Sequence, residues 1–203
     1  MTDPAVPDPA VPAGVTTPVL RTPRLVLDLV GLQDADAIVQ YCQDRELQRA
    51  IPVPVPYRHA DAVDFVTGFA RTAATSAHGH PGTVALWAIR QHGAFAGVIE
   101  LRFEELASAT LGFWLGRPWR GAGIMSEALA AVCDHGFGEL GLRRIHWAAV
   151  AGNTASAAVA ARAGFQFEGV MRQSMVHRDE RVDSWEASLL AHDPRTPARG
   201  WPL

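Results

Sequence analysis

The chain has 203 residues, 48% hydrophobic and 19% charged, which suits one globular domain and argues against extensive disorder. Its formal net charge of −3 provides no basic surface for phosphate backbones, so we expect no nucleic-acid partner. We find neither an apolar run of membrane-spanning length nor the pattern of a secretory signal, and we therefore expect a cytoplasmic protein without membrane association.

Two residue types narrow the chemistry further. The cysteines, Cys42 and Cys133, are far apart in the sequence and form no CxxC pair, which excludes a zinc ribbon and a disulfide framework. All 18 basic residues are arginines, so mechanisms that need a phosphate-loop lysine or a Schiff-base lysine are excluded as well.

Both ends of the chain are rich in proline. Proline fixes φ and removes a backbone donor, so these stretches resemble extended, solvated tails. We therefore predict a disordered tail over residues 1–18, one domain over 19–192, and a mobile C-terminal tail over 193–203.

Strand and helix patterns alternate between the tails. The predicted elements, in chain order, are a strand at 24–30, helices at 34–44 and 60–73, strands at 83–90, 94–103 and 110–115, a helix at 124–140, a strand at 143–150, a helix at 153–163, and strands at 165–170 and 183–190. The alternating prolines of residues 51–57 exclude a central strand there. This order predicts an α/β (α+β) fold around one mixed sheet.

The loop between the strand ending at Leu115 and the helix beginning at Ile124 carries the clearest chemical signal. Successive N–H groups at a helix start form an anion site, and Gly121 and Gly123 would let a ligand approach the backbone. The pattern favours a phosphate or pyrophosphate, with Arg117 or Arg120 as counter-charge. A strand-to-helix turn that simply needs two glycines is the alternative.

A second segment, around Asn153, leads from a strand into an alanine-rich helix. Asn153 suits the helix N-cap, and Ser156 lies in the first turn. The small side chains of this helix allow close packing against a sheet or a ligand. A purely structural cap explains the same residues.

Together these segments resemble the GNAT superfamily, and within it the RimJ/RimL type of N-acyltransferase. The resemblance covers roughly residues 20–191, and the motifs that carry it are Thr22–Leu27, Leu111–Leu115, Arg120–Gly123, and Asn153–Ser156 followed by Ala163–Gly169. It implies a mixed, mostly antiparallel sheet flanked by helices on both faces. It also implies direct transfer of an acyl group, in the first instance acetyl, from acetyl-CoA or another acyl-CoA to a primary amine, without a metal.

The resemblance also assigns the residues that bind coenzyme A. They are Phe113, Trp114, Leu115, Arg120, Gly121, Ala122, Gly123, Met125, Ser126, Asn153 and Ser156.

Two positions depart from the family pattern. Met125 stands at the last small position of the loop, where it would either crowd the cofactor or turn into the core. Asp28 stands in the opening strand where a basic residue is usual.

Direct attack requires a base for the amine and an acid for the leaving thiolate. Glu100 is the first candidate base, because it lies on the strand that flanks the thioester in the family; an exposed strand carboxylate is the alternative. Ser156 is the candidate acid, because the only tyrosines, Tyr41 and Tyr57, lie early in the chain and away from the loop. We interpret His146, inside a strand, as a packed residue.

Several alternatives remain open at this stage. The acceptor is a protein N-terminus or a small molecule such as an antibiotic or polyamine, and the acyl group could be succinyl. Two alternatives are not enzymes: a catalytically silent acyl-CoA-binding module, and a partner-binding domain without cofactor. The resemblance is compatible with a homodimer.

Overall fold

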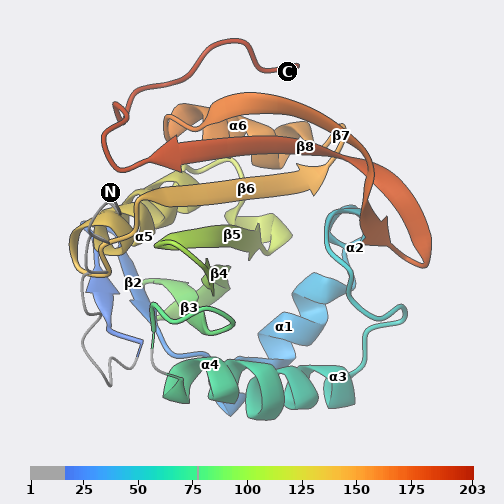
Figure 1. The fold of residues 1–203 in the computed structure, drawn as a ribbon. Coiled ribbons are helices and arrows are strands. Elements are labelled where there is room, and N and C mark those ends of the chain that lie inside the picture. The colour runs from blue at the N-terminus through green and yellow to red at the C-terminus, as the bar shows by residue number, and fades with distance from the viewer. Residues whose placement is uncertain (1–16, 77) are drawn as a thin grey trace, which may run out of the picture.

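One twisted sheet organises the fold, with helices on both faces (Figure 1). The computed structural model describes residues 17–76 and 78–203. The strands are β1 Leu20–Arg21, β2 Leu25–Asp28, β3 Val84–Gln91, β4 Ala94–Glu104, β5 Ser108–Leu115, β6 Arg144–Val150, β7 Gln166–His177 and β8 Glu180–Leu190. The helices are η1 Leu32–Asp34, α1 Ala35–Cys42, α2 Arg45–Ala50, α3 His59–Asp64, η2 Phe65–Ala70, α4 Arg71–Thr75, η3 Arg117–Trp119, α5 Ile124–Gly138 and α6 Thr154–Arg162.

The strand order is β1-β2-β3-β4-β5-β6-β8-β7. Neighbouring strands run antiparallel except for β5 and β6, which are parallel. The predicted fold class, a mixed and mostly antiparallel sheet covered by helices on both faces, is therefore confirmed.

The parallel pair at the centre is paired over only part of its length. β5 pairs with β4 from Ser108 to Leu115, and β6 pairs with β8 throughout. Between β5 and β6, however, pairing ends at Leu111↔Trp147. Residues 112–115 of β5 and 148–150 of β6 thus leave an opening in the sheet, which we call the strand opening.

Each face of the sheet has its own core. On one face, α5 and α6 pack on residues such as Leu101, Ile145 and Trp147, which are almost fully buried. On the other face, α1, α3, η2 and α4 cover a second cluster that includes Val98 and Leu86. The strand opening therefore connects two differently covered faces.

The structure differs from the predicted elements in two regions. The short helix α2 was missed. The helix predicted at 34–44 ends at Cys42, and Asp44 caps α2 by accepting from the N–H of Glu46. β7 and β8 are much longer than predicted. Two irregularities in β7, near Phe167–Gly169 and Met171–Met175, break the alternation that a strand pattern relies on.

The C-terminal segment, predicted to be a mobile tail, contacts the domain in the structure. The N–H of Ala198 donates to the Ala161 carbonyl of α6 at 2.8 Å, and the Trp201 indole N–H donates to the Phe165 carbonyl at 3.1 Å. The Trp201 ring lies 5.2 Å from the Trp147 ring and 5.4 Å from Phe167 between centroids. The packing of the Trp201 side chain offsets the entropic cost of ordering this proline-rich segment.

Two residues at the end of the predicted N-terminal tail, Thr17 and Pro18, also contact the domain. Thr17 is buried and its hydroxyl bonds His78 Nε2 at 3.1 Å, while the Pro18 carbonyl accepts from the Trp87 indole at 2.8 Å. Both residues were assigned to the tail and instead contact the domain. The remainder of that prediction concerns residues 1–16, which lie outside the described residues.

We predict that Trp201→Ala lowers the free energy of unfolding by about 2 kcal/mol, because it removes aromatic packing on Trp147 and leaves the Phe165 carbonyl without its donor. Urea denaturation would measure the change. Leu203→Ala is the control, since Leu203 is largely exposed. Equal stabilities of the two variants would show that the tail does not dock in solution.

Candidate active site

The loop before α5 presents an anion site built from backbone. Gly121 and Gly123 have φ values of 79° and 75°, which glycine adopts without steric cost. The first backbone bond of α5 runs from the Glu127 N–H to the Gly123 carbonyl, so the N–H groups of residues 121–126 have no acceptor among the described residues. These N–H groups, which we call the α5 anion site, lie at the positive end of the helix dipole.

Arg24 supplies the positive charge beside this loop. Its Nε donates to Glu127 Oε2 at 2.5 Å and its Nη1 donates to the Ala122 carbonyl at 3.0 Å. A Cβ placed on Gly123 would lie 3.5 Å from Arg24 Nη2. Sequence reasoning missed this residue, because nothing in the opening strand indicates that it reaches a loop about a hundred residues later.

Arg120 has a different role from the one predicted. Its Nη1 lies 2.8 Å from Asp44 Oδ2 and 3.0 Å from Glu46 Oε2, and its Nε donates to the Leu115 carbonyl. The side chain thus fastens the loop to α2 and is not free to act as counter-charge. Arg117 is exposed.

Tyr41 lies at the loop although it is distant in sequence, which corrects the expectation that both tyrosines lie away from it. Its hydroxyl accepts from the Trp119 indole N–H at 2.8 Å, and its ring packs against Gly116, where a Cβ would come within 2.5 Å. Trp119 is therefore held against α1. Together with the contact of Arg24 with the Ala122 carbonyl, the contacts through Trp119 and Arg120 fix the loop.

Met125 turns into the core and is 5% exposed, so its side chain does not crowd the loop. Phe113 and Leu115 pack on the same core, whereas Trp114 packs on the opposite one. Asp28, the other departure from the family pattern, pairs with Arg90 at 2.6 Å.

Glu100 is a largely buried carboxylate beside the strand opening. It pairs with Gly112 of β5, and a Cβ on Gly112 would lie 2.8 Å from Glu100 Oε1. The side chain of Glu100, 12% exposed, therefore extends across β5 where only glycine leaves room. Burial raises the pKa of the Glu100 carboxyl above its ordinary value, although the nearby Arg102, 2.6 Å away, lowers it.

Ser156 lies at the start of α6, as predicted. Asn153 caps the helix by accepting from the Ser156 N–H at 3.2 Å. The Ser156 hydroxyl oxygen accepts from the Trp147 indole N–H at 3.1 Å, so its own proton is free to be donated elsewhere.

The two candidate catalytic residues lie on opposite faces of the sheet. Glu100 pairs with Leu86, a residue of the core under α1, whereas the partner of Ser156, Trp147, belongs to the core under α5. Both positions flank the strand opening, because Glu100 pairs with Gly112 and Trp147 is the last β6 residue paired with β5. A reactant in the opening could meet one residue from each face.

His146 is engaged on both ring nitrogens. Its Nε2 lies 2.5 Å from Glu186 Oε2 and its Nδ1 lies 3.4 Å from the Thr110 hydroxyl, which itself donates to Glu104 at 2.5 Å. The ring is thus held by protein groups at both nitrogens, as expected for a packed residue.

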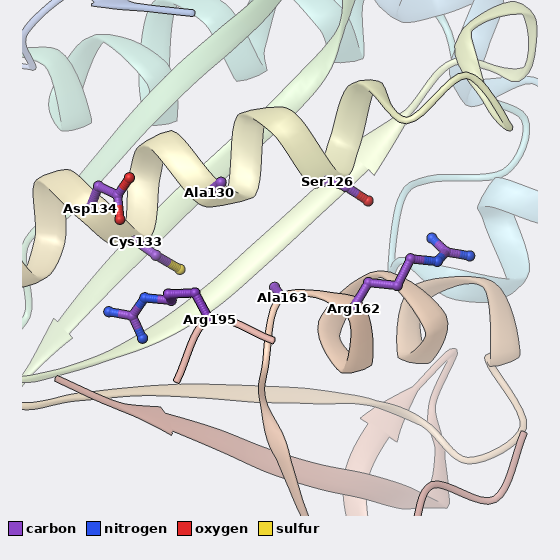
Figure 2. A pocket seen from close by; sticks show the side chains of 7 residues that line it. All are labelled: Ser126, Ala130, Cys133, Asp134, Arg162, Ala163 and Arg195. Atoms are coloured by element: carbon purple, nitrogen blue, oxygen red, sulfur yellow. The ribbon is translucent and has the colours of Figure 1, made fainter. Parts of the chain in front are cut away.

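A cavity of about 200 Å³ lies between α5 and α6. Figure 2 shows Ser126 and Arg162 at one end of it and Cys133, Asp134 and Arg195 at the other. The cavity begins in the first turn of α5, so it continues from the α5 anion site along the helix.

Among residues 17–76 and 78–203, no cluster of three or more His, Cys, Asp or Glu side chains is arranged to hold a metal ion. In the same residues, no helix has the length and apolarity needed to cross a membrane.

Comparisons with known proteins identify a family and relatives of this chain. The family described as the acetyltransferase (GNAT) domain matches residues 24–166. The uncharacterized N-acetyltransferase p20 of Bacillus licheniformis is 27% identical over 180 residues, covering 86% of this chain and 97% of p20.

Two solved structures share the fold. Mycobacterium smegmatis RimJ, in complex with CoA-disulfide, is 26% identical with a TM-score of 0.72, covering 87% of this chain and 88% of RimJ. RimL, a ribosomal L7/L12 α-N-protein acetyltransferase solved with coenzyme A, is 24% identical with a TM-score of 0.72, covering 85% of this chain and 98% of RimL.

We predict that Arg102→Gln raises the pKa of the Glu100 carboxyl further above its ordinary value. Burial remains, while the positive charge that opposes it is removed. A pH titration of the carboxyl carbon by NMR would measure the change, with Arg199→Gln in the C-terminal tail as control. A pKa that stays constant or falls would contradict the geometry described for this pair.

Proposed function

The chain belongs to the GNAT acetyltransferase family, and we propose that it transfers an acetyl group from acetyl-CoA to the α-amine of a protein or peptide by direct attack within the strand opening. The strand opening carries this proposal. The support for it is that Gly112, the partner of Glu100, and Trp147, the partner of Ser156, both border this gap, and that the α5 anion site lies in the loop that follows β5.

The chain's own groups fit acetyl-CoA. The N–H groups of residues 121–126 are free to hold the pyrophosphate, and nothing lies within 4 Å of a Cβ on Gly121 to block its approach. Arg24 lies beside them although it is paired with Glu127, and its Nη2 is 3.5 Å from where a Cβ on Gly123 would lie. The cavity between α5 and α6 would receive the adenosine end, with Arg162 available to a phosphate.

The strand opening suits the pantetheine arm and thioester. Strand edges that no longer pair with each other leave backbone donors and acceptors for its amides, and the Asn153 side chain lies at the α6 end of the same gap. Phe113 and Leu115 would contribute apolar contacts from β5. When bound, acetyl-CoA supplies the activated acyl group.

Glu100 accepts a proton from the acceptor amine, directly or through one water, which frees the nitrogen lone pair. That nitrogen forms a bond to the acyl carbon and releases its second proton to water, and the carbon–sulfur bond breaks with its electron pair passing to sulfur. Ser156 donates its hydroxyl proton to the departing thiolate and is reprotonated from solvent. The amine enters on the Glu100 face and the thiolate leaves on the Ser156 face, so the two proton transfers do not compete.

A raised pKa suits Glu100 for this role, because a base works best when its pKa approaches the operating pH. His146 is the weaker candidate, since both of its ring nitrogens already have hydrogen-bond partners within the protein. The RimL neighbour acts on a protein α-amine, which supports an acceptor of that class for this chain.

The direct test measures thiol release with acetyl-CoA and succinyl-CoA against a panel of peptides and small amines. Release that depends on acetyl-CoA and on a peptide amine supports the proposal. Binding of acetyl-CoA without release for any amine would instead favour a silent acyl-CoA-binding module, and preference for succinyl-CoA would change the acyl group.

We predict that Gly123→Val weakens coenzyme A binding at least tenfold, because a branched side chain at φ +75° displaces the backbone donors and blocks the approach. Isothermal titration calorimetry would measure the affinity. Gly141→Val is a matched control: Gly141 has φ +66°, follows α5 and has open space around it. The control should show similar strain with normal affinity, and equal losses in both variants would argue against the α5 anion site.

We predict that Glu100→Gln and Ser156→Ala both lower kcat, by roughly 10²-fold or more, while leaving the acetyl-CoA affinity unchanged. Only Glu100→Gln should remove the acidic limb of the pH–rate profile that belongs to the carboxylate, because the raised pKa places that limb above the ordinary range for glutamate.

Steady-state kinetics across pH would separate the two roles. Glu104→Gln is the control, since Glu104 is exposed on the same strand. If Glu100→Gln keeps the wild-type kcat at every pH, Glu100 is a structural carboxylate and not the base.

A further inference from the structure

The helix α2 lies beside the wide end of the strand opening. β5 and β6 both run toward the side of the molecule on which α2 lies (Figure 1). α2 is fastened at its first turn to the loop before α5, through the ion pairs of Arg120 with Asp44 and Glu46. α2 thus lies on the side of the molecule toward which the strand opening faces.

The last turn of α2 is fastened to the β7–β8 hairpin. Nε and Nη2 of Arg178 both donate to the Gln48 carbonyl, at 3.2 and 2.5 Å. That carbonyl would normally accept from the residue four positions later, which is Pro52 and has no N–H. Arg178 thus satisfies a carbonyl that the helix leaves open, and this contact fixes the turn against α2.

A depression of about 300 Å³ lies between these two elements. The residues that line it are Arg45, Gln48, Arg49, Val55 and Arg178. Three of the five are arginines, and no carboxylate lines it among the described residues. Arg45 and Arg49 are exposed and form no ion pair within the described chain.

The acidic residues nearest in sequence do not cancel this charge fully. Asp44 and Glu46 share Arg120, which lies outside the depression. Asp179 and Glu180 follow Arg178 in the turn and are exposed. The lining itself is therefore positive, with guanidinium groups whose planar donors match a carboxylate.

The turn holds Arg178 at a backbone cost. Arg178 and Asp179 have φ values of 52° and 64°, a region that glycine or asparagine adopts more readily than arginine. This conformation directs the Arg178 guanidinium toward α2. A glycine would adopt the same backbone conformation more readily but would have no side chain to make the contact. The wall of the depression is thus in place before any ligand arrives, which lowers the entropic cost of binding.

We infer that this arginine-lined depression binds the acidic side chains of a peptide acceptor, whose N-terminal amine reaches the strand opening. The inference rests on the proposed function and specifies its substrate: a peptide with glutamate or aspartate shortly after a free α-amine. Arg45 and Arg49 determine the specificity, whereas Arg178 mainly positions the wall.

The test compares short peptides with a free α-amine that differ only at the three residues after the first, which are all glutamate, all glutamine or all lysine. Free glutamate serves as a small acidic amine. We expect kcat/KM for the glutamate peptide to exceed that of the lysine peptide at least tenfold at low salt, and the ratio to shrink as salt screens the charges.

The double variant Arg45→Gln with Arg49→Gln should raise KM for the glutamate peptide about tenfold while the glutamine peptide and the acetyl-CoA affinity are unchanged. Arg71→Gln, an exposed arginine on α4, is the matched control. A loss confined to the acidic peptide is not expected of a structural defect.

Equal rates for the three peptides would overturn the inference, as would a glutamate preference that survives the double variant. Acetylation of free glutamate, with none of the peptides acetylated, would also overturn the inference. In each of these cases acetyl transfer itself still stands. Failure of the proposed function looks different: acetyl-CoA is bound and no amine in the panel is acetylated.

Discussion

The early end of pairing between β5 and β6 is the constraint on which the rest of the site depends. Each strand keeps its outer neighbour over its full length, β4 for β5 and β8 for β6, while the two strands pair with each other only as far as Leu111↔Trp147. Backbone groups beyond that point lack a strand partner across the gap, which is costly unless water or a ligand satisfies them. The strand opening therefore favours a ligand that carries amide groups.

The loop before α5 is held in place beside the strand opening by contacts that do not use its N–H groups. Arg24 and Glu127 tie it to the opening strand, Arg120 ties it to α2, and Trp119 bonds Tyr41 on α1. These contacts leave the N–H groups of residues 121–126 free and already oriented. Preorganisation of this kind lowers the cost of ordering the site when an anion binds.

The sequence was most informative where a single residue type is required by local geometry. Gly121 and Gly123 marked the anion site, and Asn153 marked the start of α6, because positive φ and N-capping are local properties. Arg24, Tyr41 and Trp201 could not be placed in the same way, since each acts through a contact with residues distant in the chain. Composition could not indicate the contacts of the C-terminal segment for the same reason, and the irregularities of β7 concealed a long hairpin.

Amide hydrogen exchange with and without coenzyme A is the most direct measurement of the central claim. The backbone N–H groups of residues 121–126 are free in the protein alone, and our account holds that they donate to the pyrophosphate when coenzyme A is bound. Exchange at these six positions should slow strongly on binding, together with exchange along the facing edges of β5 and β6. Binding that leaves residues 121–126 exchanging at their original rates would place the cofactor elsewhere and contradict the account.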